Sequence, residues 1–255
     1  MNHSILDMNK LFLLDAYSLI YRAYYGLSRT PRINSKGMNT GAIFGFVNML
    51  HEIISKGGAT HLAVAFDHGK TFRHEAYPPY KAQRQETPED IKKAVPYIKS
   101  ILEAWHIPVL QADGYEADDV IGALATAMSK LTGADIAACE TGMGQQTADE
   151  KAENSVGDNK NVRQNETEKV SEDRQDGTDG MQKDAVSSAV ETYMVTQDKD
   201  YGQLVKPNVF IYKPHQHGGG YDVIGVKEVC QQFQVERPEQ VADFLALKGD
   251  SADNF

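Results

Sequence analysis

Residues 11–26 read LFLLDAYSLIYRAYYG, and the pattern of apolar residues changes at Asp15. The four apolar residues before Asp15 are typical of a short buried strand. After Asp15, apolar side chains from Leu19 to Tyr25 recur at helical spacing. The stretch therefore predicts a strand that leads directly into a helix, with an acid at the junction.

A second strand follows one helix later. Residues 41–58, GAIFGFVNMLHEIISKGG, have the spacing of an amphipathic helix that stops at its two final glycines. We expect its buried face to hold Phe44, Val47, Leu50 or His51, and Ile54. The run HLAVAFD at 61–67 is a second buried strand. Strand, helix and strand in this order favour a βαβ unit and a parallel sheet.

The rest of the chain extends the same pattern. Three further apolar runs predict strands: 107–113, 191–200 and 208–214. Four further stretches predict helices: 87–105, 114–131, 226–233 and 237–250. The first of these is expected to begin at Thr87, with Pro88 at its first position. We therefore expect an α/β fold with a mostly parallel central sheet flanked by helices.

Acidic residues gather where the apolar runs end. There are nine of them: Asp15, Asp67, Glu116, Asp118, Asp119, Asp198, Asp200, Asp250 and Asp253. In an open parallel sheet, ligands bind in the crevice beyond the carboxyl ends of the strands. Clustered carboxylates need cations, and their oxygens suit Mg²⁺ or Mn²⁺ better than zinc. The pattern predicts a metal-dependent site for phosphoryl transfer or hydrolysis.

Each acid also has a simpler explanation when it is taken alone. Asp15 is well placed to cap the helix that follows it. Glu116, Asp118 and Asp119 suit the first turn of any helix, where acids complement the helix dipole. Independent capping does not explain why so many strand ends terminate in an acid, so the group as a whole favours a metal site.

A basic and aromatic segment follows the second strand. Residues 69–84 read GKTFRHEAYPPYKAQR and include Arg73, Tyr80, Lys81 and Arg84. Cations beside a metal site can bind phosphates, and aromatic rings can stack on unpaired bases. Arg22 lies one helix away and is expected to join them. The alternative is that residues 69–84 form an ordinary solvated loop. Because this segment directly follows Asp67, contact with a nucleic acid is favoured.

Residues 139–191 differ in composition from the rest of the chain. They contain thirteen Asp or Glu and six Lys or Arg, which gives a charge of −7 out of the total of −10. They contain no Ile, Leu, Phe, Trp or Tyr. A segment of this composition cannot bury a core, so we expect a disordered insertion.

Other functional classes have no support in the sequence. It has no Walker-type loop, no HExxH and no GxSxG. Cys139 and Cys230 lack metal-ligand spacing, which favours a reducing compartment. No signal peptide and no apolar run long enough to span a membrane is present. We therefore expect a cytoplasmic protein of the bacterial cytosol or nucleoid, with no membrane partner.

Five blocks together resemble a known family. They are FLLDAYSLIYRAYYG, AVAFDHGKTFRHEAYPPYKAQRQETPEDI, GYEADDVIGALA, VTQDKDYGQLV and LALKGDSADN. In this order they are similar to the 5′-3′ exonuclease domain of bacterial DNA polymerase I, within the flap endonuclease family and its PIN-like fold. The resemblance implies one 5′ nuclease domain over 1–255, with a helical arch at 69–105. It also implies that most of a C-terminal helix-hairpin-helix-like duplex-binding element is missing.

The resemblance also implies roles for individual residues. The acids from Asp15 to Asp119 would hold or orient one metal, and those from Asp198 to Asp253 a second. Lys81, Arg84 and Asp119 would be catalytic, with Lys81 neutralising the scissile phosphate. The nucleic acid would contact Arg22, Arg73, Tyr80, Lys81 and Arg84, with Tyr80 stacked near a terminal base. The cofactor would be Mg²⁺ or Mn²⁺. Two ions are expected, and whether a third binds stays open.

The leading hypothesis is thus an Mg²⁺-dependent 5′-3′ exonuclease or flap endonuclease that acts on DNA at 5′ ends, flaps or nicks, including RNA primers. A monomer is expected, with a polymerase domain in a longer parent chain. Because the duplex-binding element is incomplete, weak activity is expected on duplex substrates. Two alternatives stay open: an inert nucleic-acid-binding fragment, and a PIN-like ribonuclease.

Overall fold

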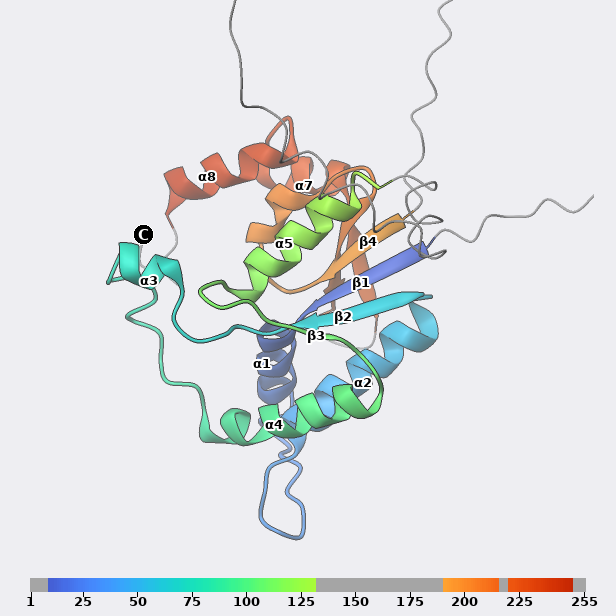
Figure 1. Cartoon of the computed structure of the whole chain (residues 1–255), viewed down its shortest axis with the longest axis vertical. Helices are drawn as coiled ribbons and strands as arrows, with labels where there is room; N and C mark the ends of the chain where they lie inside the picture. The colour runs from blue at the N-terminus through green and yellow to red at the C-terminus, as the bar shows by residue number, and fades with distance from the viewer. Residues whose placement is uncertain (1–8, 132–189, 216–219, 250–255) are drawn as a thin grey trace, which may run out of the picture. The chain divides into compact units, whose positions relative to one another are not determined.

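The computed structural model describes residues 9–131, 190–215 and 220–249 (Figure 1). Asp250, Asp253 and all but the last two residues of the predicted insertion lie outside the described residues. Those two residues, Val190 and Glu191, begin a strand, so the predicted end of the insertion was wrong by two residues. The reason is packing, since Val190 is buried and pairs with Asn9.

A six-stranded sheet forms the centre of the described structure. Its strands are β1 (Asn9–Asp15), β2 (His61–Ala65), β3 (Val109–Leu110), β4 (Val190–Val195), β5 (Val209–Pro214) and β6 (Tyr221–Ile224). They lie in the order β3-β2-β1-β4-β5-β6. All neighbouring pairs are parallel except β5 and β6, which are antiparallel. This confirms the expected α/β fold with a mostly parallel sheet.

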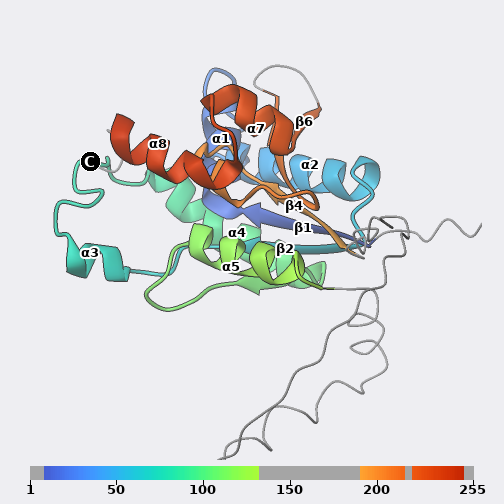
Figure 2. The ribbon, with the colours of Figure 1, turned by 90° about the horizontal axis from the view of Figure 1, so that it is seen from above.

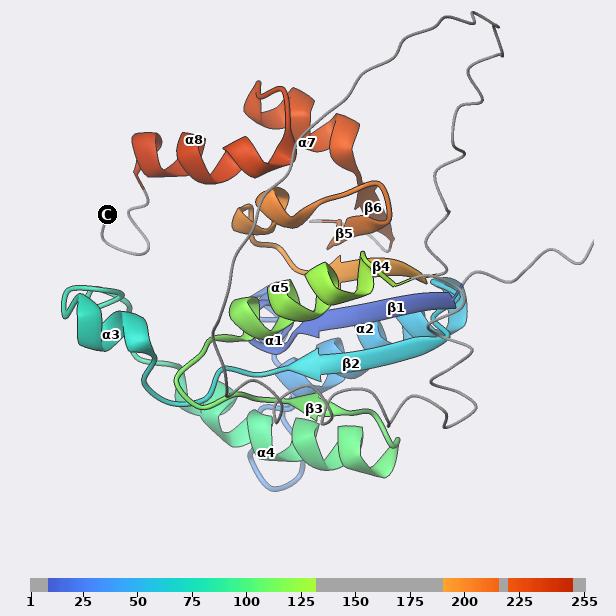
Figure 3. The same ribbon diagram turned by 45° about the horizontal axis from the view of Figure 1, so that its top comes forward.

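Helices cover both faces of this sheet (Figure 3). One face packs against α1 (Ala16–Gly26), α2 (Gly41–Lys56) and α4 (Glu89–Ala104). The other face packs against α5 (Ala117–Met128), α7 (Val226–Phe233) and α8 (Val241–Lys248). Three short helical turns complete the described part: α3 (Phe72–Ala76), η1 (Asp200–Leu204) and η2 (Pro238–Gln240).

Strand β1 shows why its sequence is a continuous apolar run. Phe12 and Leu14 point into the core on the side of α1, α2 and α4. Leu13 points into the core on the side of α5. Because successive side chains of a strand alternate between faces, a strand buried on both faces needs apolar residues at every position.

The edge strand β6 was not predicted from the sequence. Its residues Tyr221–Ile224 are half-buried at the ends and exposed in the middle. A strand of four residues with neither a buried run nor an alternating pattern gives no periodic signal. It is formed by pairing with β5, from Ile211 with Ile224 to Pro214 with Tyr221.

The predicted buried face of α2 was partly wrong. Leu50 is buried as expected, but Phe44 and Ile54 are 40% and 45% exposed. The buried residues are Gly41, Ala42, Phe46, Leu50 and Ile53. The close approach of Gly45 to Ala23 of α1 sets this face, and Phe44 instead packs beneath the guanidinium of Arg32 at 3.8 Å.

The predicted start of α4 was also wrong. Pro88 is the cap residue, the helix begins at Glu89, and no side chain caps it. Thr87 lies one residue before the cap, and its hydroxyl oxygen accepts a hydrogen bond from the Tyr21 hydroxyl at 3.0 Å.

Parallel pairing brings the carboxyl ends of β1, β2 and β4 to one edge. Asp15 is the last residue of β1, and Asp67 and Asp198 follow β2 and β4 closely. Helix α3 lies beyond this edge, away from the rest of the sheet (Figures 1 and 2). The fold therefore places the basic segment on the same side as the acids.

Contact between α1 and α2 gives a test of the fold. A Cβ atom on Gly45 would lie 2.6 Å from the Cβ atom of Ala23, which is fixed to its backbone. We expect Gly45→Ala to lower the free energy of unfolding by about 1–3 kcal/mol, measured by urea denaturation.

The matched control is Gly122→Ala in α5, where the added Cβ would meet only the side-chain tip of Leu204 at 3.3 Å. This substitution should be neutral or stabilising by up to about 1 kcal/mol, since alanine favours helix more than glycine. Equal effects of the two substitutions would contradict the packing account.

Candidate functional site

Asp15 ends β1 and caps α1 at the same time. Its Oδ1 accepts a hydrogen bond from the backbone N–H of Ser18 at 3.0 Å, and its Oδ2 accepts one from the Thr196 hydroxyl at 3.2 Å. Burial, together with the nearby charges of Asp118 and Asp67, raises the pKa of Asp15 to about 7. Asp15 thus caps α1, as the simpler explanation predicted. Its carboxylate nevertheless lies close to Asp67 and Asp118.

Asp67 and Asp118 belong to the same group. The Oδ1 atom of Asp67 accepts a hydrogen bond of 2.7 Å from the backbone N–H of Ala117, the first residue of α5. Asp118, in the first turn of α5, accepts one of 2.7 Å from the Tyr201 hydroxyl. Burial raises the pKa of Asp118 to about 6, the Tyr201 hydrogen bond opposes this, and the charges of Asp198 and Asp67 add to it.

Asp198 and Asp200 come from the turn after β4. The backbone N–H of Asp198 donates to the Thr196 hydroxyl oxygen at 3.1 Å. The backbone N–H of Asp200 donates to Asp198 Oδ1 at 3.0 Å. Both aspartates are therefore fixed by local hydrogen bonds at the start of η1.

One cavity of about 640 Å³ joins these five aspartates to two cations. Its acidic lining consists of Asp15, Asp67, Asp118, Asp198 and Asp200, and Lys81 and Arg84 also line it. Within the described residues, Asp15, Asp67 and Asp118 form no ion pair. The cavity therefore contains both carboxylates without a salt-bridge partner in the described part of the chain and basic side chains that can contact an anionic ligand.

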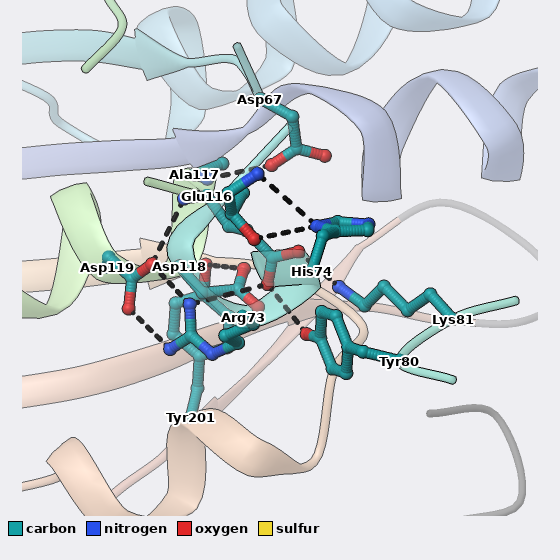
Figure 4. Close-up of polar contacts among 11 residues, drawn as sticks. Asp67, Arg73, His74, Tyr80, Lys81, Glu116, Ala117, Asp118, Asp119 and Tyr201 are labelled. Carbon is teal, nitrogen blue, oxygen red and sulfur yellow. Dashed lines mark hydrogen bonds and ion pairs between the residues drawn. The ribbon is translucent and has the colours of Figure 1, made fainter. Parts of the chain in front are cut away.

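Asp119 is held differently, by a cation from the basic segment (Figure 4). Both of its oxygens accept hydrogen bonds of 2.7 Å from Arg73, in a bidentate pair. Its Oδ2 also accepts one from the backbone N–H of Glu116 at 3.0 Å, which completes the start of α5. The hydrogen bonds from Arg73 lower the pKa of Asp119.

Glu116 also faces the basic segment (Figure 4). Its Oε1 accepts a hydrogen bond from Lys81 Nζ at 2.8 Å, and its Oε2 accepts one from the Tyr80 hydroxyl at 2.9 Å. Lys81 has a φ of 54°, in the left-handed region that a side chain rarely favours. Burial lowers the pKa of Lys81, but the hydrogen bonds with Glu116 and Tyr80 and the charge of Glu116 together outweigh it, so the pKa is raised.

A second cavity, of about 460 Å³, shares Asp118 and Asp200 with the first. It is lined by Arg73, by Asp118, Asp119 and Asp200, and by the aromatic rings of Phe72, Tyr77, Tyr80 and Tyr201. Phe72 and Tyr77 are 48% and 39% exposed. This cavity offers apolar rings and a guanidinium next to the acidic group.

Two predicted nucleic-acid-binding residues are engaged elsewhere in this structure. Tyr80 is only 4% exposed, so its ring is not open to a base. Among the aromatic residues that line the second cavity, Phe72 and Tyr77 are the exposed ones. Arg22 donates a hydrogen bond to the backbone carbonyl of His215 and so joins α1 to the end of β5. Arg73, Lys81 and Arg84 lie beside the acids, as predicted from the sequence.

The acids fit a hard divalent cation by chemistry, although their arrangement is not that of a closed metal cage. All donors are carboxylate oxygens, which suit Mg²⁺ or Mn²⁺. Within the described ranges, no three His, Cys, Asp or Glu side chains converge as a metal-binding group. Asp250 and Asp253, predicted for the second metal, lie outside those ranges.

Sequence reasoning missed three residues that hold the acids in place: Ser18, Thr196 and Tyr201. A weak signal was present in each case. Ser18 stands three residues after Asp15, Thr196 precedes the DKD sequence, and Tyr201 follows it. None has a charge, so a search for acids and bases overlooks all of them.

No helix in the described part of the chain combines the length and the apolar character needed to cross a membrane.

Comparison with known proteins gives one matching family model. Residues 10–174 match the model described as "5'-3' exonuclease, N-terminal resolvase-like domain". A 5′-3′ exonuclease of Aquifex aeolicus is 32% identical over 248 residues, which are 97% of this chain and 64% of that protein. A DNA polymerase I of Chloroflexus aurantiacus is 30% identical over 96% of this chain and only 20% of that protein. The chain thus spans less than two thirds of either relative.

Two solved structures share the fold. The bacteriophage T5 flap endonuclease, in a complex with DNA and metal ions, has a TM-score of 0.55 and 17% identity; the match covers 96% of this chain and 68% of that one. The T5 5′-exonuclease with bound zinc has a TM-score of 0.54 and 18% identity, over 96% and 69%. These likenesses confirm the PIN-like 5′ nuclease fold.

The acidic group gives a test that needs no substrate. Removing one charge with Asp118→Asn keeps an oxygen for Tyr201 and relieves repulsion from the neighbouring aspartates. In EDTA at pH 8 we expect this variant to unfold with a free energy roughly 1–2 kcal/mol higher than the unaltered protein.

The pH dependence follows from the raised pKa of Asp118, about 6 in the folded protein against an ordinary value of 3.8. The unfolded state gives up the Asp118 proton near pH 4, whereas the folded state keeps it until about pH 6. The contribution of Asp118 to stability therefore falls as pH rises from about 4 to 6, and Asp118→Asn lacks this loss. The two proteins should therefore be equally stable below about pH 4. An unchanged or lower stability of Asp118→Asn at pH 8 would contradict this account of the site.

Proposed function

Because the chain belongs to the family of 5′-3′ exonuclease N-terminal resolvase-like domains, we propose that it hydrolyses phosphodiester bonds of DNA near 5′ ends and flaps, with Mg²⁺ as cofactor. The observation that carries the proposal is the cavity where five aspartates meet Lys81 and Arg84. Carboxylates can hold divalent cations, and the two basic side chains can hold a phosphate beside them. The product would carry a 5′-phosphate.

The aspartates of this cavity are the main candidates for binding metal. Asp15, Asp67 and Asp118 would form one group, and Asp198 and Asp200 the second, with Asp250 and Asp253 as further candidates. Bound divalent ions, two in this proposal, supply Lewis-acid stabilisation of the charge that develops on the phosphate. A bound cation would offset the repulsion among these carboxylates.

Lys81 and Arg84 would bind the scissile phosphate. Both line the acidic cavity, and the Lys81 ammonium donates a hydrogen bond to Glu116. Near a phosphate, the Lys81 ammonium would gain a second anionic partner. Its positive charge would then stabilise the transition state, in which negative charge builds up on the phosphate oxygens.

The second cavity would receive the unpaired strand near the 5′ end. Arg73 contributes the positive charge of a guanidinium that is paired with Asp119, and Phe72 and Tyr77 offer exposed rings. Aromatic stacking suits bases of any sequence, as a nuclease that selects structure rather than sequence requires. We propose residues 69–88 as the part of the predicted arch that meets the strand, since α4 packs four side chains into the core.

Cleavage of a 5′-flap DNA with Mg²⁺ tests the proposal. Asp15→Asn should lower the single-turnover rate at least about 100-fold, because it weakens metal binding in a site that relies on it. EDTA should abolish cleavage, and Mg²⁺ or Mn²⁺ should restore it.

The control is Asp222→Asn, an aspartate on the edge strand β6 that pairs with His215. It should leave the rate unchanged. Flap cleavage that survives EDTA, or that survives Asp15→Asn combined with Asp119→Asn, would refute the proposal. Cleavage of single-stranded RNA but not of DNA flaps would favour a ribonuclease instead.

The role of Lys81 has its own test. Lys81→Met keeps the aliphatic stem and removes the charge, so we expect the cleavage rate to fall about 100-fold or more. Affinity for the flap, measured in Ca²⁺, should change less than about tenfold, because Arg73 and Arg84 remain.

The matched control is Lys92→Met on α4, where the lysine pairs with Glu89 at an exposed position. It should cleave at the normal rate. A Lys81→Met rate within threefold of normal would exclude Lys81 from the chemical step.

A further inference from the structure

Thr196 links the two groups of carboxylates. It is fully buried at the end of β4, between the early strands and the turn that carries Asp198. Its hydroxyl donates to Asp15 Oδ2 at 3.2 Å and accepts from the backbone N–H of Asp198 at 3.1 Å. One hydroxyl therefore contacts both the carboxylate at the end of β1 and the backbone of the second acidic turn.

Tyr201 forms a second link from the same turn. Only 2% of it is exposed, and its ring belongs to the core on the α5 side of the sheet. Its hydroxyl donates to Asp118 Oδ1 at 2.7 Å (Figure 4). The segment 196–201 thus supplies two acids of its own. It also supplies two hydroxyl donors, one to the carboxylate at the end of β1 and one to a carboxylate on α5.

These donors differ from the other partners of the acids. Arg73 and Lys81 neutralise Asp119 and Glu116, whereas a hydroxyl leaves the full negative charge on its carboxylate. Its hydrogen bond fixes only the orientation of the carboxylate. That combination suits a metal ligand, which must stay charged and must point in one direction.

From this geometry we infer that Thr196 and Tyr201 are positioning residues, which orient Asp15 and Asp118 so that both acidic groups bind divalent cations as one unit. The inference rests on the proposed function, because it requires that the aspartates hold metal. Loss of such a partner typically weakens metal binding 10- to 100-fold.

Thr196→Val tests the first link, because it removes the hydroxyl at nearly constant volume. The chain offers a matched control in Thr192→Val. Thr192 is equally buried on β4, and its hydroxyl has no hydrogen-bond partner within the described part of the chain. The dissociation constant for Mn²⁺, measured by electron paramagnetic resonance without DNA, should rise about tenfold for Thr196→Val and stay unchanged for Thr192→Val. Thr196→Ser should restore tight binding.

Tyr201→Phe tests the second link, with Tyr193→Phe as its control. Tyr193 also donates its hydroxyl to a carboxylate, Glu191, at 2.8 Å, but that pair lies on β4 outside the acidic cavity. Tyr201→Phe should weaken Mn²⁺ binding about tenfold, and Tyr193→Phe should not. This pair keeps the test decisive if Thr196→Val fails to fold.

The outcomes separate the inference from the proposed function. If the unaltered protein binds no Mn²⁺, the proposed metal site itself fails. If the unaltered protein binds Mn²⁺ and both Thr196→Val and Tyr201→Phe bind it as tightly as their controls, only the positioning roles fail. Melting temperatures measured in EDTA show whether a variant is less stable without metal. If Mn²⁺ binding weakens only in proportion to this loss of stability, the effect is purely structural and the inference is overturned.

Discussion

Repulsion among carboxylates at the carboxyl edge of a parallel sheet is the constraint on which the rest of this structure depends. Parallel pairing of β1, β2 and β4 brings their ends together, and each strand leads into an acid. Burial of Asp15 and Asp118 makes the repulsion costly, as their raised pKa values show. The surrounding elements can be understood by how they reduce this cost.

Three kinds of partner share the task. Backbone N–H groups at helix starts hold Asp15 and Asp67. Cations from the basic segment hold Asp119 and Glu116. Neutral hydroxyls on Thr196 and Tyr201 hold Asp15 and Asp118 without cancelling their charge. The two acids held by these hydroxyls line the cavity that Lys81 and Arg84 also face. The proposed nuclease function would need this separation, because its metals would require anions and its substrate would require cations.

The capping and metal-site interpretations of the acids are compatible. A carboxylate has two oxygens and several acceptor positions, so Asp15 can receive the Ser18 N–H and still face the cavity. Asp67 does the same at the start of α5. Helix capping thus fixes the position of a side chain whose remaining lone pairs stay available for a ligand.

The amino-acid sequence by itself determined the sheet, its parallel connections and the position of most acids, because buried strands and the helices between them leave periodic apolar patterns. It also identified Arg73, Lys81 and Arg84, since charged residues beside an acidic group are conspicuous. Only the tertiary structure decided the buried face of α2, the strand β6 and the partners of each acid. Those features arise from contacts between distant segments, such as Gly45 with Ala23 or Tyr201 with Asp118, which no local pattern records.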